Sequence, residues 1–359
     1  MKKDLKLMKG NEAMAEAIIR AGADAYFGYP ITPQSEILEY LAAEANKRTG
    51  MVVLQAESEV AAINMVYGAA GTGKKIITTS SSPGISLMQE GISYIACAEL
   101  PCLLVNVVRG GPGLGTIQPS QGDYFQAVKG GGHGDYKLIV LAPSTIQEMV
   151  GYVKLGFDLA FKWKNPVMIL TDGALGQMME KVELFEQMPR RDAEDKENWA
   201  TIGKPKNRER NVITSLHIQP DKMEEINLHL QEKYKKISET EVRYELYKME
   251  DADYMIVAYG LVARICQKAA MLAREKGIKV GVFRPQTLFP FPYDELGELS
   301  SKVKGILDVE MNAGQMVEDV RLAVNGRIPV KFHGRMGGLV PSPDEVLEKI
   351  EENFVEVAV

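Results

Sequence analysis

Runs of apolar residues that alternate with segments of helical spacing constrain the fold of this chain most strongly. Strand-like runs lie at 23–27, 51–56, 75–80, 102–108, 137–142 and 166–172. The later runs are apolar at nearly every position, which is typical of strands that are covered on both faces. Because helical segments lie between the runs, the sequence predicts an α/β fold with a parallel, doubly wound sheet.

The helical segments show how the first part of the chain is organised. Helices are predicted at Asn11–Arg20, Pro33–Asn46, Glu59–Ala70 and Thr145–Phe161. The hydroxyl of Thr32 or of Ser35 can cap the second of these helices. We expect residues 1–190 to form one domain.

Composition changes after residue 188, where charged residues crowd together and apolar periodicity is lost. We expect 191–250 to form a charged connector with a helix at Asp221–Tyr234, although a disordered linker would have a similar composition. A second α/β domain is predicted over 251–359. Its strands are expected within 251–260, 278–285 and 304–312, and its helices at Ala263–Lys276 and Pro343–Asn353.

Composition disfavours several classes of function. The 359 residues carry a net charge of −6 without a basic stripe, which argues against nucleic-acid and anionic-membrane partners. The longest apolar runs, such as Leu103–Val108, are far shorter than the roughly 20 residues of a membrane span. The start lacks the apolar block of a signal peptide, and three scattered cysteines suit neither a disulfide framework nor an iron–sulfur site. We therefore expect a cytoplasmic protein.

One glycine-rich segment matches a nucleotide-binding pattern only in part. Gly68–Lys75 fits GxxxxGK, but Lys75 stands where a P-loop needs Ser or Thr to bind Mg²⁺. The glycines also close a predicted helix and precede a strand, which is the reverse of a P-loop. A P-loop-like nucleotide-binding protein is the competing hypothesis, and loss of ATP-Mg²⁺ binding in Lys74→Ala would support it.

Polar side chains follow four of the predicted strands. Thr32 lies in GYPITPQSE, Glu57 and Glu59 in QAESEVAA, three serines in SSSPG, and Arg109 before GGPGLG. The carboxyl ends of parallel strands meet at one edge, where α/β sheets bind ligands, and an arginine there can hold a carboxylate by two hydrogen bonds. Each residue also has a structural explanation, since acidic residues in a first helical turn complement the helix dipole and Arg109 can be a surface residue. The residues alone leave both explanations open. The histidines, including His133 in a glycine-rich loop, show neither metal-ligand spacing nor a Ser-His-Asp order.

Five motifs taken together carry a family resemblance. They are GYPITPQSE, QAESEVAA, TSSSPGISLMQEG, ELPCLLVNVVRGGPGLG and RPQTLFPFP. In this order and spacing the chain resembles the α-type subunit of 2-oxoacid:ferredoxin oxidoreductases over nearly its whole length. The ITPQSE form and the LMKGNEA opening are similar to the 2-oxoisovalerate (3-methyl-2-oxobutanoate) branch. The 2-oxoglutarate branch resembles the chain closely as well.

The resemblance implies a thiamine diphosphate enzyme, with a pyrimidine-binding domain followed by a transketolase-C-terminal-like domain. Glu59 would be the catalytic carboxylate on the pyrimidine ring, and its neighbour Glu57 ranks second. Cofactor binding would also involve Ser82 and Gly84. By the same resemblance, Thr32 and Arg109 would contact the 2-oxo acid, through a hydroxyl and a guanidinium respectively.

The resemblance also implies partner chains. The chain lacks the Gly-Asp-Gly…Asn motif that holds the diphosphate through Mg²⁺, and it has no CxxC cluster. A β-type subunit would supply the diphosphate and Mg²⁺ site, and partner subunits, including γ-type and ferredoxin-like ones, would supply [4Fe-4S] clusters. The expected reaction is oxidative decarboxylation of a branched-chain 2-oxo acid to an acyl-CoA, with coenzyme A as cosubstrate and ferredoxin as electron acceptor.

Two alternatives to this reaction stay open. A second basic residue for a distal carboxylate would favour 2-oxoglutarate as substrate, and Lys129 and His133 are the candidates for it. A non-catalytic scaffold with the same fold is the other alternative. Unchanged turnover in Glu59→Gln would support the scaffold.

Overall fold

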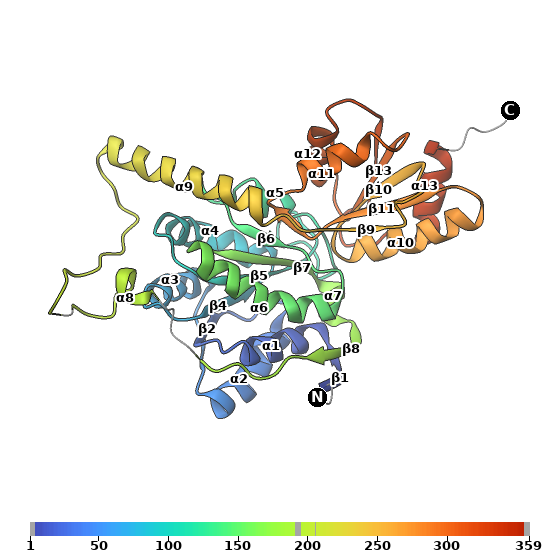
Figure 1. Ribbon diagram of the computed structural model, residues 1–359. Helices are drawn as coiled ribbons and strands as arrows, with labels where there is room; N and C mark the ends of the chain where they lie inside the picture. The colour runs from blue at the N-terminus through green and yellow to red at the C-terminus, as the bar shows by residue number, and fades with distance from the viewer. Residues whose placement is uncertain (1–3, 191–194, 205, 355–359) are drawn as a thin grey trace.

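A computed structural model describes residues 4–190, 195–204 and 206–354 of the chain (Figure 1). Within these residues the strands form a seven-stranded sheet, a five-stranded sheet and a separate antiparallel pair. The residues outside this description fall in all three predicted parts of the chain. They are 1–3 of the first domain, 191–194 and 205 of the connector, and 355–359 of the second domain.

The seven-stranded sheet carries the first part of the chain. Its strands, in spatial order, are β12 (Thr287–Phe289), β6 (Ile139–Leu141), β7 (Val167–Asp172), β5 (Leu103–Val108), β4 (Ile76–Ser80), β2 (Ala25–Gly28) and β3 (Val52–Gln55). All neighbours pair in parallel except β12, which is antiparallel to β6. The predicted parallel sheet is confirmed, and β12 is an addition from much later in the chain.

Helices cover both faces of this sheet. One face packs against α1 (Gly10–Arg20), α2 (Ser35–Thr49) and α6 (Ile146–Trp163), and the other against α3 (Glu59–Ala70), α4 (Ser82–Cys97) and the short α5 (Tyr124–Val128). Every residue of β4, β5 and β7 is buried, which in β5 and β7 explains why the sequences are nearly continuous in apolar residues.

The second helix begins differently from the prediction. It starts at Ser35 rather than at Pro33, and its N-cap residue is Gln34 without a side-chain capping hydrogen bond. The prediction of a Thr32 or Ser35 cap is therefore wrong. The Gln34 amide instead accepts a hydrogen bond from the Thr79 hydroxyl (2.5 Å), so tertiary contacts set this helix start.

The glycine-rich segment at the end of α3 lies as its sequence predicts. Gly71 is the C-cap residue of α3, Gly73 has a positive φ of 77°, and β4 follows at Ile76. A P-loop needs a strand before it and a helix after it, so the competing nucleotide-binding hypothesis lacks its structural context.

The second sheet lies in the later part of the chain. Its order is β14 (Val330–Gly334), β13 (Ile306–Glu310), β10 (Tyr254–Val257), β11 (Val280–Pro285) and β9 (Tyr244–Tyr247), the last antiparallel to β11. Its flanking helices are α10 (Gly260–Glu275), α13 (Pro343–Phe354), α11 (Tyr293–Ser300) and α12 (Met316–Val324). The predicted α/β character of this part is confirmed.

Several elements were not predicted from the sequence. The strand β1 (Asp4–Lys9) pairs with β8 (Met179–Leu184), and a short α7 (Gly173–Gln177) follows β7. In the predicted connector, α9 (Pro220–Thr240) confirms the helix expected at Asp221–Tyr234, and it runs along the first sheet's helices toward the second sheet (Figure 1). The short α8 (Lys196–Trp199) was not predicted. Strand β9 lies within the predicted connector yet belongs to the second sheet. The boundaries of the domains themselves stay a prediction.

A buried carboxylate joins α1 to α2. Glu16 accepts hydrogen bonds from Arg20 Nε (2.6 Å), Arg48 Nη1 (2.5 Å) and the Tyr40 hydroxyl (3.0 Å). Burial alone would raise the pKa of Glu16, but the hydrogen bonds from Arg48 and Arg20 outweigh it and lower the pKa from 4.5 to about 2. A lowered pKa contributes stability above the unfolded value, and that stability is lost as pH falls toward 2.

We expect this cluster to govern part of the chain's acid sensitivity. Between about pH 6 and about pH 3, Glu16→Gln should lose roughly 2 kcal/mol less free energy of unfolding than the unaltered chain, since its side chain does not titrate. Urea midpoints at both pH values measure this. Glu12→Gln, in the same helix, is the control and should keep the unaltered pH dependence. If the free energy of unfolding of all three proteins fell equally between the two pH values, the role of Glu16 in acid sensitivity would be contradicted.

Candidate functional site at the carboxyl ends of four strands

The polar segments singled out in the sequence converge on one edge of the seven-stranded sheet. They follow β5, β4, β2 and β3, which are consecutive neighbours in the sheet. Arg109 follows β5, Ser82 and Gly84 follow β4, Thr32 follows β2, and Glu59 follows β3. The prediction that these strand ends lie together is confirmed.

Glu59 is the first residue of α3. The hydroxyl of Ser58 caps this helix by accepting a hydrogen bond from the Ala61 N–H (3.2 Å). This places Glu59 inward, where it is only 6% exposed, whereas Glu57 is exposed. No other described residue donates a hydrogen bond to the Glu59 carboxylate. A buried carboxylate without an internal partner is costly, so this geometry favours an external donor.

Gly84 makes the approach between α3 and α4 possible. A Cβ atom at this position would lie 2.1 Å from Ser80 Oγ and 2.6 Å from Glu59 Oε1. Both distances are far below van der Waals contact, so a larger residue would displace the carboxylate. The first turn of α4 therefore leaves Glu59 beside a backbone without a side chain.

Arg109 is almost fully buried, and the loop around it holds its guanidinium. Nη1 donates to the Thr32 carbonyl (2.9 Å) and Nη2 to the Leu114 carbonyl (3.0 Å). Nε is buried and has no hydrogen-bond partner among the described residues. The guanidinium is thus fixed in place and retains N–H groups for another acceptor.

Thr32 and Ser82 support the position of Arg109. Thr32 is exposed, and its carbonyl rather than its hydroxyl contacts the guanidinium. The Ser82 hydroxyl lies 3.1 Å from the Arg109 N–H, which donates to it, and 3.2 Å from the Arg109 carbonyl. Ser82 therefore connects α4 to the end of β5, a contact that the sequence does not indicate.

A hydrogen-bonded polar pair behind Ser82, with Asn106 fully buried, was also missed by sequence reasoning. The amide oxygen of Asn106 accepts from the Ser82 N–H (3.1 Å), and its Nδ2 donates to Asp123 (2.8 Å). Burial raises the pKa of Asp123, and the Asn106 hydrogen bond partly offsets this. Asn106 lies inside the apolar run of β5, and a polar residue at a buried strand position is the signal that could have identified it.

The two candidates for a second basic residue lie elsewhere. Lys129 donates to the buried Asp319 carboxylate, which also accepts from Tyr124 OH (2.6 Å) and Tyr293 OH. This contact joins α5 to α11 and α12. His133 is exposed, and its ring contacts Tyr94 edge-on at 6.1 Å between centroids.

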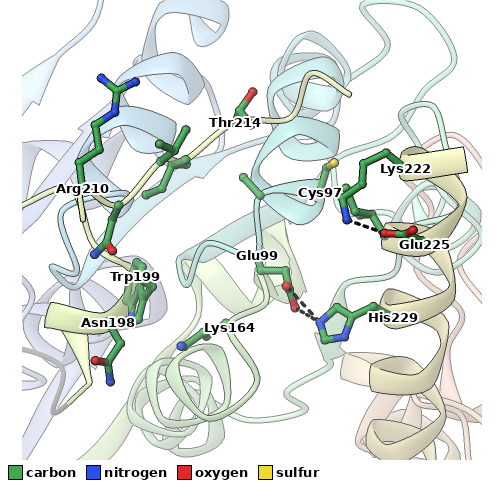
Figure 2. Close-up of a pocket in the computed structure, with 15 residues that line it drawn as sticks. Cys97, Glu99, Lys164, Asn198, Trp199, Arg210, Thr214, Lys222, Glu225 and His229 are labelled. Atoms are coloured by element: carbon green, nitrogen blue, oxygen red, sulfur yellow. Dashed lines mark hydrogen bonds and ion pairs between the residues drawn. The ribbon is translucent and has the colours of Figure 1, made fainter. Parts of the chain in front are cut away.

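A cavity of about 670 Å³ lies away from these strand ends, between α9 and the end of α4 (Figure 2). Figure 2 shows the His229 ring of α9 pointing at Glu99, with Nε2 3.1 Å from each carboxylate oxygen. Lys222 is likewise paired with Glu225. The cavity's lining includes none of the strand-end residues, so it is separate from the candidate site.

Neither a metal-ligand cluster nor an apolar helix of membrane-spanning length occurs among the described residues. No group of three His, Cys, Asp or Glu side chains could hold a metal ion among them. None of the described helices combines the length and apolarity that a bilayer crossing requires.

Comparisons with known proteins agree with one another. Residues 16–248 match the thiamine diphosphate-binding domain of pyruvate flavodoxin/ferredoxin oxidoreductases, and residues 252–346 match core domain II of pyruvate:ferredoxin oxidoreductase. Ketoisovalerate oxidoreductase subunit VorB of Methanothermobacter thermautotrophicus is 50% identical over 97% of this chain and 97% of its own length. The 2-oxoglutarate synthase subunit KorA of Archaeoglobus fulgidus is 36% identical over 97% of this chain and 99% of its own.

A solved structure is similar over nearly the whole chain. It is 2-oxoglutarate:ferredoxin oxidoreductase from Magnetococcus marinus with 2-oxoglutarate, coenzyme A and succinyl-CoA bound. The TM-score is 0.87 at 28% identity, with 98% of this chain and 65% of that chain covered.

Proposed function

The chain belongs to the 2-oxoacid:ferredoxin oxidoreductases as an α-type subunit, and on that premise we propose that it decarboxylates a branched-chain 2-oxo acid within a multisubunit complex. Thiamine diphosphate is the cofactor of the reaction, coenzyme A the cosubstrate and ferredoxin the electron acceptor. The observation that carries the proposal is the buried Glu59 carboxylate, which has no hydrogen-bond donor among the described residues.

The strand-end residues fit the aminopyrimidine ring of thiamine diphosphate. The ring offers a nitrogen that can share a proton with a carboxylate, and Glu59 is a buried carboxylate that lacks a partner. Gly84 keeps the space beside this carboxylate free of a side chain. When bound, thiamine diphosphate supplies the nucleophilic carbon and the electron sink for the decarboxylation.

The residues of this chain would hold a proton at the cofactor ring and orient the substrate carboxylate. Glu59 would hold a proton at the ring nitrogen, which favours the tautomer that activates the cofactor. Arg109 would direct its remaining N–H groups at the substrate carboxylate, and Thr32 would offer its exposed hydroxyl to the same molecule. Because backbone carbonyls already hold the guanidinium, little side-chain freedom is lost when the substrate binds.

A partner subunit is needed to complete the site. The chain lacks the Gly-Asp-Gly…Asn motif, so the diphosphate, Mg²⁺ and iron–sulfur clusters would be bound by β-type, γ-type and ferredoxin-like subunits. Next to Glu59, α3 exposes Val60 and Met65, and α4 exposes Leu87, which is 54% exposed. The edge strand β3 exposes Val52 and Leu54 as well. An apolar surface beside a ligand site supports a subunit interface there.

Two observations favour a branched-chain substrate over 2-oxoglutarate. The 50% identical relative is a ketoisovalerate oxidoreductase subunit, whereas the 2-oxoglutarate synthase subunit is 36% identical. Lys129 is paired with Asp319 and His133 packs on Tyr94, so neither candidate for a distal carboxylate is placed beside Arg109.

Reconstitution with the partner subunits tests the proposal. We expect the assembled complex to reduce ferredoxin with 3-methyl-2-oxobutanoate at a kcat/KM at least about tenfold above that with 2-oxoglutarate, because a hydrophobic pocket leaves a distal carboxylate unpaired. The isolated chain should oxidise neither acid. Turnover by the isolated chain would refute the shared site, and a preference for 2-oxoglutarate would refute the substrate assignment.

A further inference from the structure

Two hydroxyl groups of β4 are buried without a hydrogen-bond partner among the described residues. The side chains of Thr78 and Ser80 lie two residues apart, so both face the layer of α3 and α4. Both residues are fully buried, and neither Oγ atom has a hydrogen-bond partner among the described residues. The hydroxyl of Thr79, on the opposite face, bonds to both Tyr26 and Gln34.

A buried hydroxyl without a partner is costly, and folded proteins rarely keep one. The two orphan hydroxyls differ in their distance from the site. Ser80 is the last residue of β4, so it lies at the edge where the strand ends converge, whereas Thr78 lies one pleat deeper in the sheet. Of these two hydroxyls, Ser80 is therefore the one placed near a bound ligand and Glu59.

The position of Gly84 defines how close Ser80 and Glu59 lie. A Cβ atom at Gly84 would be 2.1 Å from Ser80 Oγ and 2.6 Å from Glu59 Oε1. Ser80 Oγ and Glu59 Oε1 are therefore separated by no more than the sum of these two distances. The two groups are neighbours without a hydrogen bond in this structure, so a rotation of the Ser80 hydroxyl about χ1 or a shift of the carboxylate would be needed to join them.

We propose that Ser80 is a positioning residue for Glu59, which it holds by donating a hydrogen bond to the carboxylate. The inference rests on the proposed function, because it assumes that Glu59 meets the aminopyrimidine ring. A carboxylate has two oxygens, and a donor on one of them leaves the other free for the ring nitrogen. The hydroxyl thus sets the plane of the carboxylate, and it gains a partner when the site is assembled.

The test compares three variants in the reconstituted complex. Ser80→Ala removes the proposed donor, Thr78→Val removes an equally buried orphan hydroxyl on the same face, and Glu59→Gln removes the carboxylate. Two quantities are measured besides turnover. They are the Kd for thiamine diphosphate and the near-ultraviolet circular dichroism of the bound aminopyrimidine, which reports its tautomer.

We expect Ser80→Ala to raise the Kd about tenfold and to weaken the circular dichroism signal of the activated tautomer. Thr78→Val should leave both quantities unchanged. Far-ultraviolet spectra and co-elution with the partner subunits establish that each variant folds and assembles. If Ser80→Ala and Thr78→Val behave alike while Glu59→Gln loses activity, the role of Ser80 is refuted and the proposed function stands. If Glu59→Gln also retains full activity, the proposed function itself fails.

Discussion

A reconstituted complex that carries Glu59→Gln is expected to turn over its 2-oxo acid at least about 10²-fold more slowly than the unaltered complex. The amide keeps the size of the side chain but cannot hold a proton at the ring nitrogen. The environment supports this assignment, because Glu59 is buried beside Gly84 with no donor from the described chain. Steady-state reduction of ferredoxin at saturating cofactor and substrate measures the effect.

Glu57→Gln is the matched control for this experiment. Glu57 precedes Glu59 by two residues and is exposed, so its substitution changes the charge of the same segment without reaching the site. We expect it to keep turnover within about twofold of the unaltered complex, since exposed substitutions are usually mild. Unchanged turnover in Glu59→Gln would favour the non-catalytic scaffold. A large loss of turnover in Glu57→Gln would indicate that Glu57, rather than Glu59, is the catalytic carboxylate.

Substitution of Arg284 is expected to produce the largest loss of stability. This arginine is only 2% exposed and lies on β11 of the second sheet. It donates two hydrogen bonds to Glu148 of α6 (2.6 and 3.0 Å) and a third to Glu245 of β9 (2.7 Å). Because Arg284→Met would leave Glu148 partly buried without its cation, we expect a loss of about 3–5 kcal/mol in the free energy of unfolding.

Urea unfolding followed by circular dichroism measures this loss. Arg284→Lys keeps the charge but not the planar fork, so it should recover only part of the stability. Lys154→Met removes an exposed ion pair with Asp158 and should change stability by less than about 1 kcal/mol. Equal midpoints for Arg284→Met and Lys154→Met would show that the contact between α6 and the second sheet contributes little.

The sequence predicts best those strands that are covered on both faces. The strands β5 and β7 are apolar at almost every position because helices lie against both sides of them. The three-residue β12 shows no such pattern, since it is a strand only because β6 offers an open edge. Likewise, β1 alternates apolar and polar residues, but its partner β8 lies far along the chain. Pairings of this kind depend on distant segments, which local periodicity does not describe.

The candidate site was predictable in outline rather than in detail. The polar residues that follow the strands indicated which side chains converge, because parallel strand ends share an edge. The contacts of Arg109 were not predictable, since its partner carbonyl at Thr32 lies 77 residues away and belongs to the backbone. The unused hydroxyl of Ser80 also becomes visible only in three dimensions, where its burial and its lack of a partner can be seen together.

The position of β12 has a consequence for how the chain is made in a cell. Strand β6 ends at Leu141, but the strand that covers its outer edge is complete only at Phe289. At about 5–20 residues per second, a ribosome needs roughly 7–30 seconds to synthesise the intervening segment. During that interval the nascent sheet presents an open edge, which is the kind of surface at which chains associate wrongly. The edge of the N-terminal sheet is therefore covered only after residue 289 has emerged from the ribosome.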